Sequence, residues 1–385
     1  MDKQAFQDSP SGRLVPTERG QWAFVPDPLP PSSLDLSPLI AKCSEVSHKV
    51  GELNGVARLL RDPFLLIRPL QAREALSSSS MEGTYSTVDD LMIAELETEE
   101  RQPSADTREV WNYRRALAAA LASMETVPLS LRTLRDAHRT LVSGVQRNRG
   151  ARAEGGEFKK HQNFIGAYEI ENARFVPPPP QNAETCLDQL EKFIHRPDRG
   201  GLPALVEAAL VHYQFETIHP FSDGNGRVGR MLITLHLHML GVIRQPILYL
   251  SPTFERRKDE YIDRMFDVSR KGDWIGWIGF FLDVVAHASD AAIGTADRLR
   301  ELEGEFRIRL ETSGRSPNLA RIVEDLFRQP VVTIPIVAQR LGVTYRAAQM
   351  NVESLVKAGI LSEIAGTSYP KFFRAREILD TIKGP

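Results

Sequence analysis

The chain has 385 residues, of which 42% are hydrophobic and 25% charged, and its formal net charge is −2. This is the composition of a globular protein of two or three domains, and the near-neutral charge argues against a protein that binds nucleic acid or an anionic membrane over its whole surface. The two cysteines, Cys43 and Cys186, are too few for a disulfide framework, and no apolar run reaches the roughly 18 residues of a membrane span. The first residues show no signal-peptide pattern, so we expect a cytoplasmic protein.

Residues 1–37 are rich in proline, serine and aspartate, which predicts an extended arm rather than a helix. A helix is expected from about Ser37 to Leu60, because apolar residues recur there at helical intervals. The dipeptide Asp62-Pro63 then breaks it, since proline cannot continue a helix.

The next helix is expected to begin near Pro69, since proline is favoured in a first helical turn, and to end at Gly83. A run of serines and then Met81 precede Glu82 at its end. An acidic side chain there opposes the helix dipole at a cost of about 0.3–1 kcal/mol. On local grounds alone, Glu82 is interpreted as a solvated carboxylate beside a helix cap.

Two further helices are predicted over Asp106–Met124 and from Ser130 to about Val142. The pattern then changes to glycine-bearing turns and two short strands, Phe164–Glu169 and Arg174–Val176, which predict a β-hairpin. The loop before the hairpin carries basic residues that either favour an acidic partner or are simply solvated: Arg147, Arg149 and Arg152.

The most informative stretch is residues 219–230, which reads His-Pro-Phe-Ser-Asp-Gly-Asn-Gly-Arg-Val-Gly-Arg. Helices predicted over Ala183–Ile194 and Pro203–His219 lead to it, and Pro220 ends the second of them. This places a titratable imidazole, that of His219, at the end of a helix.

Glycines and arginines complete this stretch. Gly224 and Gly226 permit backbone conformations in which successive N–H groups converge on an anion. Arg227 and Arg230 follow at a spacing of three, which puts both on one face of a helix. Together they predict a phosphate-binding helix N-terminus with a base beside it.

Three other interpretations of the glycines were weighed. Gly224, Gly226 and Gly229 match the dinucleotide fingerprint G-x-G-x-x-G, but that motif needs a preceding strand and an acidic residue about 20 positions later. Here a helix precedes, and no Asp or Glu occurs between Arg230 and Arg244. A nucleoside-triphosphate P-loop is excluded because no Lys-Ser or Lys-Thr follows the glycines. A purely structural helix–turn–helix remains as the third.

Residues 219–230 resemble the signature of the Fic family, H-x-F-x-(D/E)-G-N-G-R-x-x-R, and match it at every fixed position. The resemblance implies an enzyme that transfers AMP from ATP to a hydroxyl side chain of a target protein and releases pyrophosphate. It implies His219 as general base, since an imidazole suits neutral pH, and Asp223 as a ligand of Mg²⁺. The nucleotide would be held by an anion hole and two arginines: Gly224, Asn225 and Gly226, then Arg227 for the β-phosphate and Arg230 for the γ-phosphate.

The resemblance also implies features outside the signature. The predicted hairpin corresponds to a flap that holds the target segment by strand addition. A helix predicted over Glu255–Ser269 corresponds to the lining of the adenine pocket, where Arg256 or Tyr261 would stack on the base. Gln214 either reaches the nucleotide or satisfies backbone groups near its helix end. The remaining histidines are not spaced with acids as a metal set, so helix packing is expected for His212, His236 and His238.

Ser78-x-x-x-Glu82-Gly83 resembles the inhibitory motif of this family, (S/T)-x-x-x-E-(G/N). The resemblance implies that Glu82 pairs with Arg230 and takes the place of the ATP γ-phosphate, because carboxylate and phosphate compete for one guanidinium. Such a charge-assisted bond contributes about 1.5–3 kcal/mol, or roughly 10- to 150-fold in occupancy. An autoinhibited enzyme is therefore expected.

The C-terminal part begins after a core helix predicted over Trp274–Ala288. Ala291–Leu310 alternates charge sign and predicts a solvated helical linker. Beyond Ser316-Pro317, helices over Asn318–Arg328, Ile334–Leu341 and Thr344–Ala358 and two strands, Ile360–Ile364 and Tyr369–Arg374, predict a winged helix. In a DNA-reading version Thr344–Gln349, at the start of the Thr344–Ala358 helix, would face the major groove, but acidic residues dilute the basic ones, so domain packing or dimerisation is favoured.

The sequence thus predicts a mainly α protein with an arm (1–37), an N-terminal helical region with an inhibitory helix at about 69–83 (38–125), a catalytic core with a small β-hairpin flap (126–290), a charged helical linker (291–315) and a winged helix (316–385).

The expected function is Mg²⁺-dependent, autoinhibited AMP transfer to Ser, Thr or Tyr hydroxyls of target proteins or of the chain itself. Removal of AMP at the same site is an alternative, because Glu82 could orient a water. A DNA-binding regulator whose core senses nucleotide is the alternative from another class. A homodimer is compatible with the sequence, and no membrane partner is expected.

Overall fold

The computed structural model describes residues 1–59, 62–96, 103–145, 154–313, 316–365 and 370–384. The loop arginines Arg147, Arg149 and Arg152 lie outside this part of the chain. The described chain is mainly helical, as predicted, with small antiparallel sheets near its two ends. None of the described helices is both long and apolar enough to cross a bilayer.

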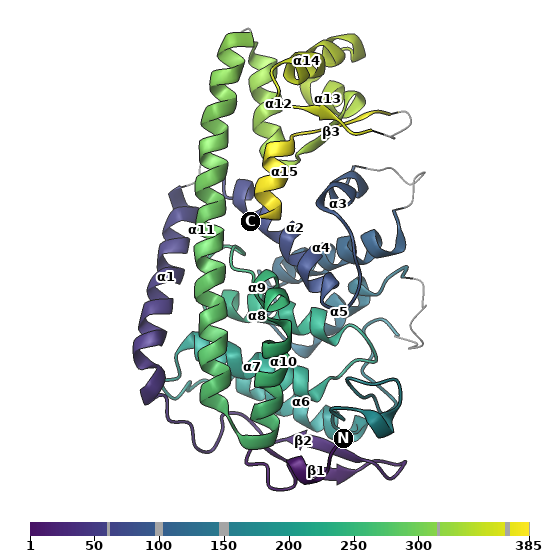
Figure 1. The fold of residues 1–385 in the computed structure, drawn as a ribbon, viewed down its shortest axis with the longest axis vertical. Helices are drawn as coiled ribbons and strands as arrows, with labels where there is room; N and C mark the ends of the chain where they lie inside the picture. The colour runs from purple at the N-terminus through teal and green to yellow at the C-terminus, as the bar shows by residue number, and fades with distance from the viewer. Residues whose placement is uncertain (60–61, 97–102, 146–153, 314–315, 366–369, 385) are drawn as a thin grey trace.

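A single long helix, α11 (Trp274–Ser313), runs along most of the molecule, and α1 (Ile40–Leu59) lies along its outer side (Figure 1). The core helix and the charged linker predicted from the sequence are therefore one continuous helix of 40 residues, and the prediction of a separate linker is wrong. The C-terminal half holds its helical form with ion pairs along one face, such as Arg298 with Glu305 at 2.8 Å. Its apolar residues Leu302 and Phe306 are fully buried, while the side chains of Arg300 and Arg307 are 71% and 68% exposed, so this half has one packed face and the solvated charged face that the sequence predicts.

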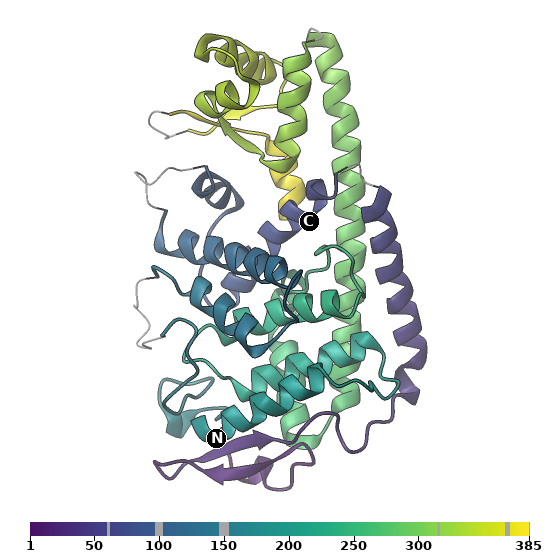
Figure 2. The ribbon, with the colours of Figure 1, turned by 180° about the vertical axis from the view of Figure 1, so that it is seen from behind.

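The N-terminal arm is extended, as predicted, but it pairs with itself. Strands β1 (Gly12–Pro16) and β2 (Trp22–Pro26) form an antiparallel hairpin, which lies at the lower end of the molecule beneath α6 (Figure 2). A short 3₁₀ helix, η1 (Gln4–Phe6), precedes it. The rings of Phe6 and Phe24 pack on Phe175, so aromatic burial fixes the arm against the core.

Helix α2 (Phe64–Ser80) begins five residues before the predicted start, so Pro69 lies inside it and not in its first turn. Pro69 removes one intrahelical hydrogen bond, but Leu66 and Ile67 of the earlier turn are buried, and this burial extends the helix. A 3₁₀ helix, η2 (Ser37–Leu39), precedes α1, and α3 (Val88–Ala94) follows α2.

The central helices occur close to where the periodicity predicts them: α4 (Ala105–Ser123), α5 (Leu131–Leu141), α6 (Pro180–Ile194), α7 (Ala204–Ile218) and α8 (Asn225–Met239). The helix predicted over 255–269 is instead two helices, α9 (Ser251–Arg256) and α10 (Lys258–Lys271), with a break at Arg257. The predicted hairpin is reduced to one antiparallel bridge, Ile165 with Phe175, around a 3₁₀ turn, η3 (Ile170–Asn172).

The C-terminal part has the predicted order of elements, with two that the sequence did not reveal. Helices α12 (Pro317–Arg328), α13 (Ile334–Leu341) and α14 (Tyr345–Lys357) accompany an antiparallel sheet in the order β3-β5-β4, made of Val331–Thr333, Phe372–Arg374 and Ser362–Glu363. Strand β3 and the final helix α15 (Arg376–Lys383) are the unpredicted ones.

This C-terminal part is docked on the segments that flank Glu82. Arg374 pairs with Asp89 of α3 at 2.6 Å, and the Gln329 amide donates to the Met92 carbonyl at 3.1 Å. Helices α12 and α15 also pack on α2.

Candidate active site

The loop from α7 to α8 contains two residues with left-handed backbone conformation. His219 caps α7 in the left-handed conformation, with φ of 50°, the one such non-glycine residue in the described chain. Left-handed backbone is strained for a residue with a side chain and is typical of functional positions. Gly224 is left-handed as well, at φ 78°, and starts α8, so the first N–H groups of that helix face the loop.

Asn225 closes the loop on itself. Its Oδ1 accepts from the N–H of Phe221 at 2.7 Å, and its Nδ2 donates to the Phe221 carbonyl at 2.8 Å. Both polar atoms of the side chain are thus bonded to backbone, so a nucleotide would meet the Asn225 main-chain N–H rather than its amide. Phe221 is fully buried, so its ring anchors the loop in the core.

Three residues that the sequence analysis did not identify support this loop from outside. Asn163 donates to the carbonyls of His219 at 2.9 Å and Phe221 at 3.0 Å, and Lys159 donates to the carbonyl of Ile218 at 3.1 Å. Neither position carried a signal in the sequence beyond lying in a polar run before the predicted hairpin.

The third supporting residue is His138 of α5. Its Nδ1 accepts from the Gly156 N–H at 3.0 Å, which leaves Nε2 to donate to the Asp223 carbonyl at 3.0 Å, and its ring stacks on Phe221. Burial lowers the pKa of His138 to about 4, so the neutral ring that these two bonds require is present at neutral pH. Its position on the apolar face of a predicted helix was the signal that could have revealed it.

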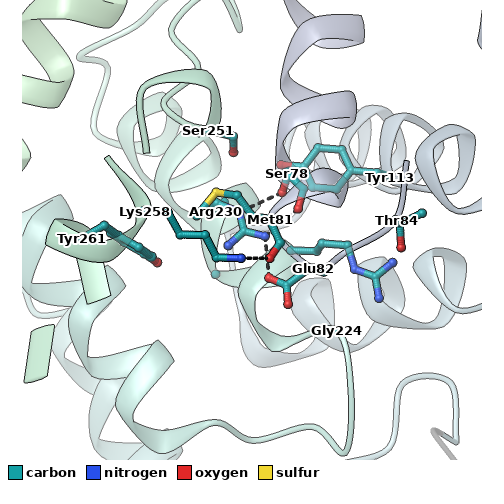
Figure 3. A network of polar contacts seen from close by, with 12 residues as sticks. Ser78, Met81, Glu82, Thr84, Tyr113, Gly224, Arg230, Ser251, Lys258 and Tyr261 are labelled. Atoms are coloured by element: carbon teal, nitrogen blue, oxygen red, sulfur yellow. Dashed lines mark hydrogen bonds and ion pairs between the residues drawn. The ribbon is translucent and has the colours of Figure 1, made fainter. Parts of the chain in front are cut away.

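Arg230 of α8 meets the end of α2. Its guanidinium is 2% exposed and donates to the Glu82 carboxylate at 2.7 Å, to the Ser78 hydroxyl at 2.9 Å and to the Ser78 carbonyl at 2.8 Å. Figure 3 shows Arg230 between Ser78 and Glu82, with Lys258 reaching the Met81 carbonyl beside them. The structure therefore brings the two motifs together across 148 residues of sequence.

The charges of Glu82 and Arg230 together outweigh the effect of burial on the protonation of the pair. Burial alone would raise the pKa of the Glu82 carboxyl, but the neighbouring charge of Arg230 holds it below the ordinary value. In the same way, burial disfavours a charged Arg230, and the Glu82 carboxylate keeps its pKa above the ordinary value. The pair is ionised at neutral pH.

Arg227 has a carboxylate partner of its own. Its Nη1 donates to Glu109 of α4 at 2.7 Å, and its Nη2 lies 3.9 Å from the Asp223 carboxylate. Asp223 itself is half exposed and accepts from the Gly224 N–H at 2.6 Å. Nothing in the local sequence around Glu109 indicates this pairing.

A cleft of about 320 Å³ opens beside these groups. It is lined by four of the predicted site residues and by Glu82: His219, Gly226, Arg230 and Tyr261. The other residues of the signature and Ser78 do not line it, and two predicted residues outside the signature have other contacts. Gln214 is buried and donates to the Asp27 carbonyl at 3.0 Å, and Arg256 lines a different hollow with Arg73 and Ala291.

The cleft contains ionisable groups with strongly shifted pKa values. Burial, reinforced by the charge of Lys159, lowers the pKa of His219 to about 4. Burial raises the pKa of Glu216 to about 7, and its Oε1 is buried without a hydrogen-bond partner among the described residues. Perturbed groups gathered in one cleft are characteristic of an active site.

Two glycines of the signature, Gly226 and Gly229, allow side chains to approach the backbone of α8 closely and do not adopt the left-handed conformation. A Cβ on Gly226 would lie 2.2 Å from Glu82 Oε1, and one on Gly229 would lie 2.1 Å from Glu216 Oε1. Both residues are within α8 and have ordinary helical conformation. They are therefore required by the carboxylates that pack over them.

Two of the three histidines for which helix packing was predicted, His212 and His236, are fully buried between helices. His212 bonds to the Gly229 carbonyl and the Tyr261 hydroxyl, and His236 bonds to buried Glu207. No cluster of three or more His, Cys, Asp or Glu side chains suited to a metal occurs within the described ranges.

Comparison with known protein families agrees with this geometry. The model of the Fic/DOC family N-terminal domain matches residues 40–122, and the Fic/DOC family model matches residues 128–237. The chain carries Fic/DOC family domains. The Fic domain holds the whole loop from His219 to Arg230, and the Fic N-terminal domain holds Glu82 and Glu109. Both carboxylate–arginine pairs thus join one domain to the other.

Relatives and solved structures extend the comparison. The chain is 25% identical over 204 residues to the protein adenylyltransferase Fic of Drosophila yakuba, a match that covers 51% of this chain and 37% of that protein. It is 26% identical over 171 residues to the protein of the same name from Aedes aegypti, covering 44% and 30%. The chain thus spans less than two fifths of these curated relatives.

Among solved structures, a Fic family protein from Desulfovibrio desulfuricans matches 90% of this chain and 98% of its own, with a TM-score of 0.56 at 19% identity. Residues 134–508 of Fic-1 from C. elegans match 68% of this chain and 75% of their own, with a TM-score of 0.52 at 18% identity. At these identities the likeness shows a shared Fic fold.

Proposed function

We propose that this chain transfers AMP from ATP to a hydroxyl side chain of a target protein and releases pyrophosphate. The observation that carries the proposal is the strained His219 beside the N-terminus of α8, with Arg227 and Arg230 on that same helix. A base, a row of free N–H groups and two guanidinium groups are what attack on an α-phosphate requires. The names of the relatives from Drosophila yakuba and Aedes aegypti support this reaction class.

In this mechanism His219 accepts the proton of the target hydroxyl as its oxygen attacks the α-phosphorus. The bond from the α-phosphorus to the α–β bridging oxygen breaks, and pyrophosphate leaves. With a pKa of about 4, His219 is neutral and able to accept a proton throughout the neutral range. The N–H groups at the start of α8 meet the charge of the α-phosphate, while Arg227 holds the β-phosphate and Arg230 the γ-phosphate.

Asp223 fits the role of a magnesium ligand. Its carboxylate is half exposed beside the helix N-terminus, where the phosphates would lie, and supplies a hard oxygen to a cation that keeps waters and binds phosphates. When bound, Mg²⁺ would neutralise charge on the phosphates.

The enzyme is autoinhibited in this proposal, since Glu82 occupies the guanidinium that the γ-phosphate needs. The target segment would add to the short bridge at Ile165, which borders the cleft, by backbone pairing. Tyr261 borders the cleft as well and remains the candidate for contact with adenine.

We interpret the C-terminal part as a winged helix that serves for packing or protein contact. Its α14 exposes Tyr345 and Met350, which suit a protein surface better than a phosphate backbone. Gln349 of this helix is bonded to Glu353 rather than left available to read a base.

Labelled ATP tests the proposal. The full chain with Glu82→Gly is expected to label itself or proteins of a lysate faster than the unaltered chain, and His219→Ala to bind ATP without transfer. Glu125→Gly is the matched control, because Glu125 is an exposed acid in the turn after α4. Labelling by Glu82→Gly no greater than that by His219→Ala would reject the transfer reaction. Equal labelling by Glu82→Gly and the unaltered chain would reject inhibition by Glu82.

A further inference from the structure

Both arginines of the α8 face are paired with carboxylates of the chain itself. Arg230 is held by Glu82, and Arg227 by Glu109, which lies 118 residues away on α4. The side chains of Arg227 and Glu109 are only 5% and 14% exposed. Taking one partner away from a pair so shielded from water leaves a buried charge uncompensated, so any ligand of Arg227 has to replace Glu109 or share the guanidinium with it.

Glu109 is also joined to the segment that carries Glu82. The Oε2 atom that accepts from Arg227 accepts from the Thr84 hydroxyl at 3.0 Å, and Thr84 follows Glu82 by two residues. The next residue, Tyr85, is tied to the same helix, since its N–H donates to Asp106 at 3.0 Å. The first turns of α4 therefore hold the segment after Glu82, and Glu109 connects that segment to α8.

The guanidinium of Arg227 is not saturated by these contacts. Its Nε is buried and has no hydrogen-bond partner among the described residues. A phosphate offers more acceptor atoms than the one Glu109 oxygen to which Arg227 now donates, so an exchange of partners would not leave the guanidinium unbonded.

We propose that Glu109 is a second internal competitor of the nucleotide, which occupies Arg227 as Glu82 occupies Arg230. This rests on the proposed function, in which Arg227 binds the β-phosphate. A β-phosphate displaces Glu109 from Arg227, and the freed carboxylate no longer fixes Thr84. Binding at Arg227 thereby loosens the segment that carries Glu82, and the two inhibitory contacts are released in a coupled way.

Nucleotides of different length test this, because AMP lacks a β-phosphate, ADP has one and ATP adds the γ-phosphate. Binding of each with Mg²⁺ is measured by calorimetry on the full chain. Glu109→Gln keeps the shape and an acceptor but removes the charge, so ADP and ATP are expected to bind roughly 10-fold tighter, with AMP unchanged. Glu82→Gln is expected to tighten ATP more than ADP, because only ATP has the γ-phosphate that competes with Glu82 directly.

Asp106→Asn is the matched control. It loosens the same segment through Tyr85 but leaves the partner of Arg227 in place, so ADP affinity is expected to rise clearly less than in Glu109→Gln. Thermal unfolding of each variant checks that the fold is kept.

Three results would overturn the inference. Weaker ADP binding in Glu109→Gln would show that Glu109 positions Arg227 for the phosphate instead of competing with it. An equal change for AMP and ADP would indicate a general loosening of the site, and no change for any nucleotide would show that the pair exerts no competition. Tighter ADP binding without any AMP transfer would reject the proposed reaction and leave the assignment of Glu109 standing.

Discussion

Lys159 offers a direct test of how the protein sets the basicity of His219. It is 4% exposed and donates to Asn163 at 2.8 Å and to the carbonyl of Ile218, the residue before His219. Burial lowers the pKa of Lys159 to about 7, so below that pH its ammonium is charged. This charge is the second cause, after burial, of the low pKa of His219.

The expected size of the effect follows from these values. The pKa of His219 falls from 6.5 to about 4, and burial is the larger cause. Lys159→Met keeps most of the length of the side chain and removes its charge. We therefore expect the pKa of His219 to rise, so that the acid limb of the pH–rate profile shifts by about one unit toward higher pH. Because His219 accepts a proton only when neutral, the rate at pH 5 is expected to fall to roughly half of its plateau.

The assay is the initial rate of AMP incorporation between pH 4 and pH 8, measured in the Glu82→Gly background so that transfer is not limited by inhibition. Lys160→Met is the matched control, because Lys160 is the adjacent residue but is exposed and paired with Glu154. An acid limb that coincides for Lys159→Met and Lys160→Met would refute the reasoning. A rate reduced equally at every pH would show that Lys159 only shapes the loop.

Two further predictions concern stability. His138 has a folded pKa of about 4, below its ordinary 6.5, so the unfolded chain binds protons first and the free energy of unfolding should fall by about 2 kcal/mol for this group between pH 7 and pH 5. Urea denaturation should show a smaller fall in His138→Gln, and an identical fall would contradict the assignment. Gly229→Ala should lower the free energy of unfolding by about 1–3 kcal/mol, because its Cβ would meet Glu216. Gly51→Ala, a helical glycine with open space around it, should instead stabilise by up to about 1 kcal/mol, and equal thermal shifts in the two variants would refute this explanation.

The positions of most helices could be predicted because helix formation leaves a local trace. Apolar residues recur at helical intervals over α1, α4, α6 and α7, and serine caps mark the starts of α4 (Ser104) and α5 (Ser130). The signature at 219–230 was equally local, since a helix stop, glycines and arginines at fixed spacing define the loop by themselves. Expectations that depended on one local signal, such as a helix start at Pro69, were wrong where burial of neighbouring residues favoured another boundary.

What the sequence could not determine are the contacts between distant segments. The arm's pairing into β1 and β2, the continuity of α11 and the support of the loop by His138, Lys159 and Asn163 depend on which surfaces meet in the folded chain. Contacts of this kind leave no periodic pattern in the sequence from which they could be predicted.

The two arginines of α8 illustrate this division. The sequence by itself determined that Arg227 and Arg230 share a helix face, and a short motif associated Glu82 with one of them. Only the tertiary structure decided that Glu109 pairs with the other, since α4 and α8 approach each other across 118 residues of chain. A buried carboxylate and a buried guanidinium each lose hydration, and only their pairing offsets that cost. Which two residues pair depends on how the helices pack, and the spacing of residues along the sequence does not indicate it.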